Sequence, residues 1–220
     1  MLLLIIPQGT AASGLDLANA LGDVLYRLGF QGVADITGGA DQYVTVAELY
    51  QWADEGAKKL SYAAGVFVTV DTSITVASPT AVYALPGTHV FTLMAALAGV
   101  PLRITPVREL EALDATWPAT SGPATRCSFD AGAVGIITLY PLPTAGGTLA
   151  QICQEFPATI AQGSSTLGLP TVMQDYFSYA MMAGARGKES DAAMPEMAAH
   201  FEERMKLYEQ VARELWGRGQ

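Results

Sequence analysis

The chain is poor in the residues that bind metals or react as nucleophiles. Its 220 residues include only two cysteines, Cys127 and Cys153, and two histidines, His89 and His200. No CxxC or HExxH motif and no closely spaced Cys/His group occurs in the sequence, so a zinc site has no support. We therefore expect no metal and no cofactor, and we interpret the cysteines as small buried thiols in a reducing compartment.

Long hydrophobic runs are also missing. The apolar run Met1 to Ile6 is far shorter than the ~20 residues that a helix needs to span a bilayer. It has neither the basic flank nor the small-residue cleavage site of a secretory signal. We interpret this run as a short opening β-strand, and we expect a soluble protein that works without export and without a membrane.

Positive charge is scarce and nowhere concentrated. Twelve Lys and Arg residues stand against 21 Asp and Glu residues, which gives a formal net charge of -9. Acids outnumber bases in residues 1–64, in residues 65–170 and in residues 171–220. A surface that binds DNA without sequence specificity needs clustered Lys and Arg, so the sequence argues against one. DNA that passes near this protein would be repelled rather than held.

The motifs of common catalytic sites are absent. The sequence contains no GxSxG nucleophile elbow, no GxxxxGK[ST] phosphate loop and no glycine motif that leads a strand into a helix. Gly163 to Thr166 is interpreted as a polar loop, and carboxylate pairs such as Glu109 and Glu111 as solvated helix faces. Trp117 could form a ligand platform, but a loop aromatic that covers a β core explains it better. We predict no catalytic residue and no enzymatic activity.

Half of the residues are hydrophobic, and their spacing is helical near the beginning of the chain. Leu15 to Leu28 carries one apolar face and stops before Gly29. A second helix begins at a capping box, in which the Thr45 hydroxyl and the Glu48 carboxylate satisfy first-turn amides. From there to Ala64, apolar residues repeat at i, i+3, i+4 and i+7.

Helical spacing returns near the end of the chain. Thr171 and Gln174 predict another capping box at the start of one helix. The last and longest helix has Pro195 near its start, where proline is tolerated, and an apolar stripe along one face. Two early and two late helices predict a four-helix bundle built from residues 1–64 and 171–220.

Between residues 65 and 170 the pattern changes to short β-branched runs with turn signals. The predicted strands are 66–70, 74–76, 82–85, 89–97, 102–105, 124–130, 136–140 and 149–156. Residues 130–132 and 145–147 predict hairpin turns, and 107–113 interrupts the strands as a short helix. Strands of this length predict a small antiparallel sandwich or barrel. The predicted fold class is therefore α+β, a helical bundle with a central antiparallel β insertion.

Several short segments follow one another in a particular order from the second helix onward. They are Leu49–Gly56, Ile74–Val76, Tyr83–Pro86, Pro101–Arg103, Glu109–Leu110, Trp117, Gly122–Arg126, Gly135–Pro143, Leu169–Pro170 and Phe201–Arg204. In this order and spacing they resemble the head-to-tail adaptor proteins of bacteriophages with podovirus-like necks, the family typified by the adaptor of phage SU10. The match covers roughly residues 45–215, and it leaves out Met1 to Pro7 and the first helix.

The resemblance implies a structural virion protein. Its subunits would form a homo-oligomeric ring with twelvefold symmetry on the portal protein and would extend the DNA channel. Genomic DNA would pass through without sequence-specific binding, and tail or nozzle proteins would dock on the ring. Such a subunit would assemble in the host cytoplasm and lie in the neck between capsid portal and tail.

Two contact surfaces are expected for such a subunit. The end of the last helix, around Tyr208, Arg213 and Trp216, is expected to contact the portal, because a protruding helix end is easy to dock. The opening strand is expected to add to the sheet edge of a neighbouring subunit through Leu2, Leu3, Leu4, Ile5 and Ile6.

Two other functions remain open at this point. The β insertion could hold a glycan or a peptide on Trp117, as a receptor-binding module that would form trimers. The chain could also be a hydrolase that uses Asp130 or His89, which would require a deep polar pocket with perturbed titrating groups.

Overall fold

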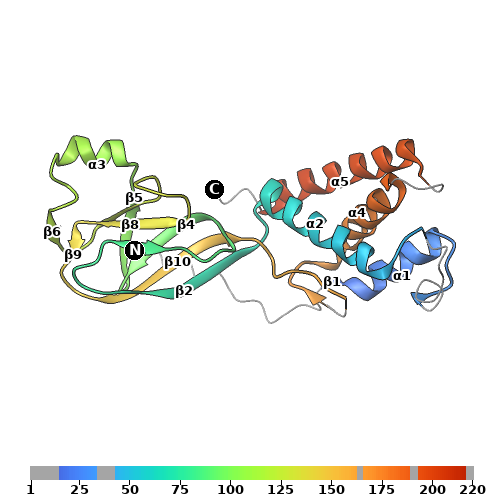
Figure 1. The fold of residues 1–220 in the computed structure, drawn as a ribbon, viewed down its shortest axis with the longest axis horizontal. Helices are drawn as coiled ribbons and strands as arrows, with labels where there is room; N and C mark the ends of the chain where they lie inside the picture. Colours follow the sequence, from blue (N-terminus) through green and yellow to red (C-terminus); the bar gives the residue numbers. More distant parts are fainter. Residues whose placement is uncertain (1–14, 34–42, 163–165, 189–192, 217–220) are drawn as a thin grey trace. The chain divides into compact units, whose positions relative to one another are not determined.

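The chain folds into two compact units, which we call the helical unit and the β unit (Figure 1). The computed structural model describes residues 15–33, 43–162, 166–188 and 193–216. The helical unit combines Met1–Ala64 with Pro157–Arg218, and the β unit is Gly65–Phe156. The fold is α+β, with a nearly closed, barrel-like sheet inserted between helical segments, which confirms the predicted fold class.

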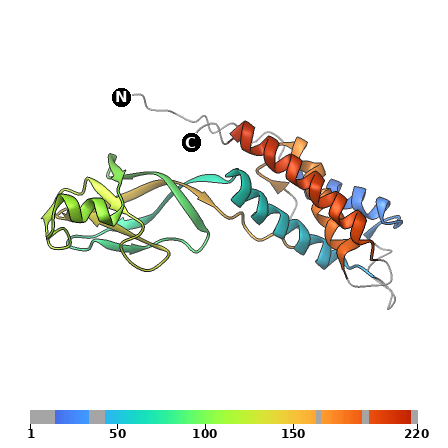
Figure 2. The same cartoon turned by 90° about the horizontal axis from the view of Figure 1, so that it is seen from above.

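The described part of the helical unit contains four α-helices: α1 (Leu17–Arg27), α2 (Val46–Ala64), α4 (Gln174–Gly187) and α5 (Pro195–Trp216). Helix α4 contacts the other three, and α2 also contacts α5 (Figure 1, Figure 2). Tyr176 and Phe177 of α4 are among the largest fully buried side chains. The bundle therefore forms only when the end of the chain packs against its beginning. None of the helices in the described ranges is both long and apolar enough to cross a membrane.

The predicted capping box at the start of α2 is present. The backbone N–H of Glu48 donates to Thr45 Oγ1 at 3.2 Å, and the backbone N–H of Thr45 donates to Glu48 Oε2 at 2.9 Å. At its other end α2 stops before Gly65, which has a φ of +63°, a conformation that glycine adopts without strain. The sequence therefore predicted the start of this helix from its capping box and its end from the last residue of the helical repeat.

The second predicted capping box, at Thr171 and Gln174, is wrong. Residues Thr171–Met173 form a 3₁₀ turn, η2, and α4 begins only at Gln174, without a side-chain cap. Gln174 is therefore the first residue of the helix and not the third, so its side chain cannot bond back to the start of the turn. It reaches α1 instead, where Nε2 donates to Asp23 Oδ2 at 3.5 Å.

The β unit ends at Phe156, earlier than the expected boundary at residue 170, because the segment after it is bound to the helical unit. Ile160 N donates to the buried Asp54 Oδ1 at 2.8 Å. Further along, β11 (Thr166–Leu167) pairs antiparallel with β1 (Leu15–Asp16). This pairing keeps residues 15 and 16 extended, so the first helix begins at Leu17 and not at Leu15.

The main sheet of the β unit has seven strands in the order β2-β10-β4-β5-β7-β8-β3. Their bounds are Val68–Val76, Gly147–Glu155, His89–Leu97, Val100–Ile104, Arg126–Ser128, Ile136–Tyr140 and Val82–Ala84. Neighbours are antiparallel except β5 and β7, which are parallel. Helix α3 (Val107–Leu113) lies in the crossover that this parallel pair requires. A further parallel pair joins β6 (Ser121–Gly122) and β9 (Leu142–Pro143).

Two expectations for the β region are wrong: the break between strands 66–70 and 74–76, and the hairpin turn at 145–147. Asp71 to Ser73 does not separate two strands but lies within β2, where the register with β10 shifts. Residues 145–147 do not close a hairpin, because β9 pairs with β6 while β10 pairs with β2 and β4. The turn at 130–132 does connect an antiparallel pair, β7 and β8. Periodicity located the strands but could not show which of them pair.

Helices α2 and α4 cross at very short range. A Cβ atom added to Gly184 would lie 2.2 Å from Cδ2 of the Trp52 ring, and one added to Gly56 would lie 2.9 Å from the Ala180 Cβ. At the same crossing, the Tyr176 hydroxyl donates to the Gly56 carbonyl at 3.0 Å. The indole of Trp52 therefore packs directly on the backbone of α4, which only glycine permits.

Replacing Gly184 by alanine should destabilise the helical unit by about 1–3 kcal/mol, because the new methyl group collides with the Trp52 ring. Gly22 in α1 is the matched control, since an added Cβ meets nothing within 4 Å there. Gly22→Ala should instead stabilise the helical unit by up to about 1 kcal/mol. Urea unfolding followed by circular dichroism at 222 nm checks both changes, and equal behaviour of the two variants would contradict the crossing described.

Candidate functional site

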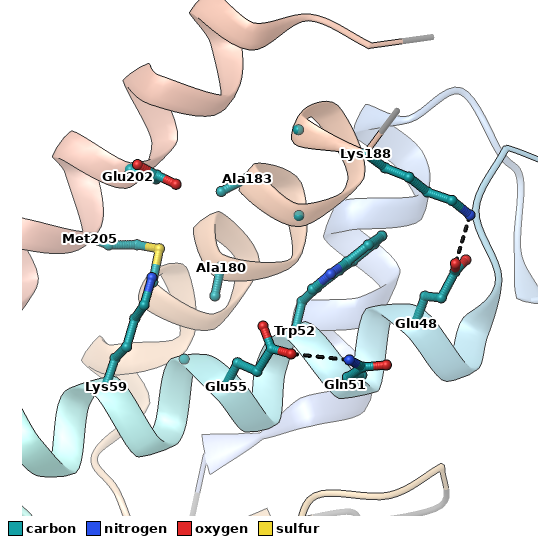
Figure 3. A pocket seen from close by; sticks show the side chains of 13 residues that line it. Glu48, Gln51, Trp52, Glu55, Lys59, Ala180, Ala183, Lys188, Glu202 and Met205 are labelled. Atoms are coloured by element: carbon teal, nitrogen blue, oxygen red, sulfur yellow. Dashed lines mark hydrogen bonds and ion pairs between the residues drawn. The ribbon is translucent and has the colours of Figure 1, made fainter. Parts of the chain in front are cut away.

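The helical unit contains an open groove of about 460 Å³ between α2, α4 and α5 (Figure 3). Helix α4 contributes only small residues to its lining, namely Ala180, Ala183, Gly184 and Gly187. These four positions follow one another at i, i+3, i+4 and i+7, so they share one face of the helix. The missing side-chain volume on this face leaves the space of the groove.

The groove has an apolar floor and a charged rim. Trp52 stands between α2 and α4, and Met205 of α5 lies beside the small residues of α4 (Figure 3). Around them the lining includes three carboxylates and two ammonium groups, from Glu48, Glu55, Glu202, Lys59 and Lys188. An apolar floor with a few polar groups at its edge is typical of binding surfaces that orient a ligand.

One end of the groove is held by an ion pair between α2 and the end of α4. Lys188 Nζ donates to Glu48 Oε1 at 2.6 Å, while Glu48 Oε2 accepts from the backbone N–H of Thr45 in the capping box. The hydrogen bond from Lys188, together with those from Thr45, lowers the pKa of Glu48 below its usual value, against the opposing effect of burial. A neighbouring bond joins Gln51 Nε2 to Glu55 Oε1 at 3.0 Å.

The groove has features of a binding site, an apolar floor beside charged groups. Its lining residues include no Ser, Cys, Thr or His that could act as a nucleophile or a general base. Among the residues described, no group of three His, Cys, Asp or Glu side chains could hold a metal ion. The arrangement can accept a chain segment with an apolar side chain for Trp52 and polar groups for the rim.

The residues expected at the portal contact have bonds within the helical unit. The Tyr208 hydroxyl donates to Asp175 Oδ2 of α4 at 3.1 Å, and burial raises the pKa of Tyr208. Arg213 Nε donates to the Ala63 carbonyl in the last turn of α2 at 3.0 Å. Trp216 is the last residue of α5, and its side chain lies outside the described residues. The portal contact stays a prediction, as does the contact of Leu2 to Ile6, which also lies outside them.

Asp130 and His89, the residues considered for a hydrolase, form hydrogen bonds within the β unit. Asp130 Oδ1 accepts from the backbone N–H of Val107 at 3.0 Å, and its bond from Ser128 lowers the pKa of Asp130. His89 Nε2 lies 2.7 Å from Thr92 Oγ1, and burial lowers the pKa of His89. Neither Asp130 nor His89 lines the groove or the cavity beside Trp117.

Trp117, considered as a ligand platform, lines a cavity of only about 160 Å³ together with apolar residues such as Val82 and Ile136. Its ring packs edge-on against Tyr140, with 6.4 Å between the centroids. Ligand pockets generally enclose ~300–1,000 Å³, a range that includes the groove on the helical unit but not this cavity. The groove was not predicted from the sequence, although the spacing of the small residues on α4 indicates a helix face without bulky side chains.

The β unit has a second exposed surface, formed by apolar residues of the sheet. Val70 is 58% exposed on β2, and Phe91 and Met94 are 55% and 59% exposed on β4. In the register of the sheet, Val70, Ile152 and Met94 form one row across β2, β10 and β4. Contiguous apolar residues on a surface indicate contact with another protein.

Replacing Glu48 by glutamine should remove the ion pair but keep the capping box, which glutamine can also form. Because the folded pKa of Glu48 is lowered, its charge stabilises the fold above about pH 4.5, the usual value. That contribution is lost as the pH falls below 4.5. We expect the variant to lose only ~0.2–1 kcal/mol at pH 7, because the pair is partly exposed, and progressively less as the pH falls below 4.5.

Urea unfolding at several pH values measures this difference. The control is Lys188→Met, alone and combined with Glu48→Gln: the double variant should lose less than the sum of the two single variants, because both changes remove the same pair. A loss for Glu48→Gln that is equal at pH 3 and pH 7 would argue against the ion pair.

The two cysteines should resist thiol reagents in the folded chain. Both are free and buried, and burial raises the pKa of Cys127 to about 12 and that of Cys153 to about 11. Only the thiolate reacts, so a coloured disulfide reagent at pH 8 should label neither cysteine before urea unfolds the chain and both afterwards. Rapid labelling of the folded chain would show that one of the thiols is accessible.

A comparison with models of protein families finds no match to this chain, and a comparison with curated proteins finds none either. The function must therefore be inferred from the residues, charges and exposed surfaces of the chain itself.

Proposed function

We propose that the chain is a head-to-tail adaptor subunit of a tailed bacteriophage, a structural protein of the virion neck and not an enzyme. The observation that carries the proposal is the ordered series of segments that resembles the adaptor family. Three of these segments lie in separate elements: Leu49–Gly56 lies in α2, Gly135–Pro143 spans β8 and β9, and Phe201–Arg204 lies in α5.

The distribution of exposed surfaces supports an assembled subunit. A ring of identical subunits needs two different complementary faces on each copy, because its contacts are head-to-tail. A subunit between portal and tail needs further contacts above and below the ring. The chain offers the groove on the helical unit and the apolar sheet face on the β unit, which are separate surfaces of different chemistry.

The charge of the chain supports the same role. Its formal net charge of -9 suits a channel wall along which genomic DNA must slide, since like charge prevents adhesion. The partners proposed are the portal protein, tail or nozzle proteins and eleven further copies of the same chain in a twelvefold ring. The end of α5 remains the proposed portal contact, where Tyr208 and Arg213 fix the helix to α4 and α2.

Quantitative mass spectrometry of purified particles of the phage that encodes the chain tests this function. The expected result is one copy of the chain for each copy of the portal protein, because an adaptor ring matches the portal's symmetry. The chain should stay with the particle after DNA ejection. Its absence from purified particles, or a copy number that corresponds to trimers of a receptor-binding protein, would contradict the proposal.

A further inference from the structure

The outer edge of the main sheet is open at the beginning of β2. The strand is the last one on its side of the seven-stranded sheet (Figure 1). Glu155 N of β10 donates to the Phe67 carbonyl at 2.9 Å, so the backbone groups of Phe67 face β10. In an antiparallel pair every second residue turns its N–H and C=O away from the partner. At this end of β2 those residues are Val68 and Val70.

The chain just beyond the other end of β2 is bound by a side chain. The Tyr83 hydroxyl accepts from Ala77 N at 2.9 Å and donates to the Ala77 carbonyl at 3.0 Å, directly after the last residue of the strand. Among the residues described, no backbone bond of this kind is recorded on the outer side of Val68 and Val70. The outward backbone groups of Val68 and Val70 are therefore available to another strand.

The open edge borders the exposed apolar face. Val68 and Val70 project from the same side of β2, and the face continues across the sheet to Phe91 and Met94 on β4. The face consists of two rows of residues across β2, β10 and β4: Val70, Ile152 and Met94 in one, and Val68, Gln154 and Phe91 in the other. Neither row contains a Lys, Arg, Asp or Glu. An edge of this kind is usually protected by charge or covered by another strand. The chemistry of the face selects an uncharged, apolar strand.

The chain itself contains a segment of this chemistry outside the described residues. Residues Leu2 to Ile6 are five consecutive apolar residues without charge, proline or glycine. In an added strand, Leu2, Leu4 and Ile6 would project to one side and would extend the rows of Val68 and Val70. Both the hydrogen-bonding groups and the apolar character of this segment are complementary to the open edge.

We propose that residues 2–6 of one copy add as a β-strand to the outer edge of β2 in a neighbouring copy, beside Val68 and Val70. The donor and the acceptor are different surfaces of one chain, so the contact is heterologous and leads to rings or longer assemblies. The inference concerns contacts between copies and does not require a portal. It can therefore fail while the adaptor role holds, and the reverse is equally true.

Hydrogen exchange of a chain that lacks residues 2–6 tests the proposal directly. The probe is a peptide of residues 1–8 with a solubilising lysine tail, added in excess up to millimolar concentration. The amides of Val68 and Val70 should exchange rapidly in the truncated chain without peptide, and at least tenfold more slowly when the peptide is present. The same peptide with Leu4→Pro, which cannot complete the pairing, should have no effect. Unchanged exchange at Val68 and Val70 with the unmodified peptide would overturn the proposal.

A mixing experiment shows whether the strand comes from another copy. Chain lacking residues 2–6 is an acceptor only, and full-length chain with Val70→Pro is a donor only, because proline removes the outward N–H of the edge. Each variant alone should be monomeric in sedimentation velocity, and an equimolar mixture should form a heterodimer. Full-length Val70→Thr is the control that keeps this N–H and should associate as the unmodified chain does.

Two outcomes of the mixing experiment would contradict exchange between copies. Either variant could associate by itself as strongly as the unmodified chain, which would place the contact elsewhere. Alternatively, the mixture could stay monomeric although the peptide protects Val68 and Val70, which would show that the strand binds within its own chain.

Discussion

The helical unit depends on the contact between the Trp52 ring and the bare backbone of Gly184. This contact allows α2 and α4 to approach closely enough for the Tyr176 hydroxyl to bond the Gly56 carbonyl. Helix α4 can then contact α1, α2 and α5 at once. The same small residues that permit the approach leave the groove empty of side chains, so the packing constraint and the candidate site have one origin.

The insertion of the β unit into the helical unit has a simple geometric basis. The first and last strands of the insertion, β2 and β10, pair with each other, and Glu155 N bonds Phe67 O close to both ends. Chain entry and exit therefore lie side by side, which is the arrangement that lets one domain be inserted into another. Gly65 turns the chain out of α2, and Asp54 binds the returning segment at Ile160.

Much of the fold could be predicted from the sequence because its signals are local. Strands 89–97 and 136–140 and the helix at 107–113 have the predicted bounds, and the Thr45–Glu48 capping box is present. The error at Thr171 arises because residues 171–173 form a 3₁₀ turn, and the one at Asp71 because pairing with β10 continues on both sides of it. The groove was not predicted because its walls, such as Trp52 and Gly184, are far apart in the sequence.

We propose that this chain is one subunit of a ring on a portal. Electron microscopy of the purified chain mixed with the portal ring of its own phage tests this role. We expect a second ring stacked on the portal with the same rotational symmetry. A chain that leaves the portal unoccupied and forms a stable trimer by itself would argue against the role and would favour a receptor-binding module.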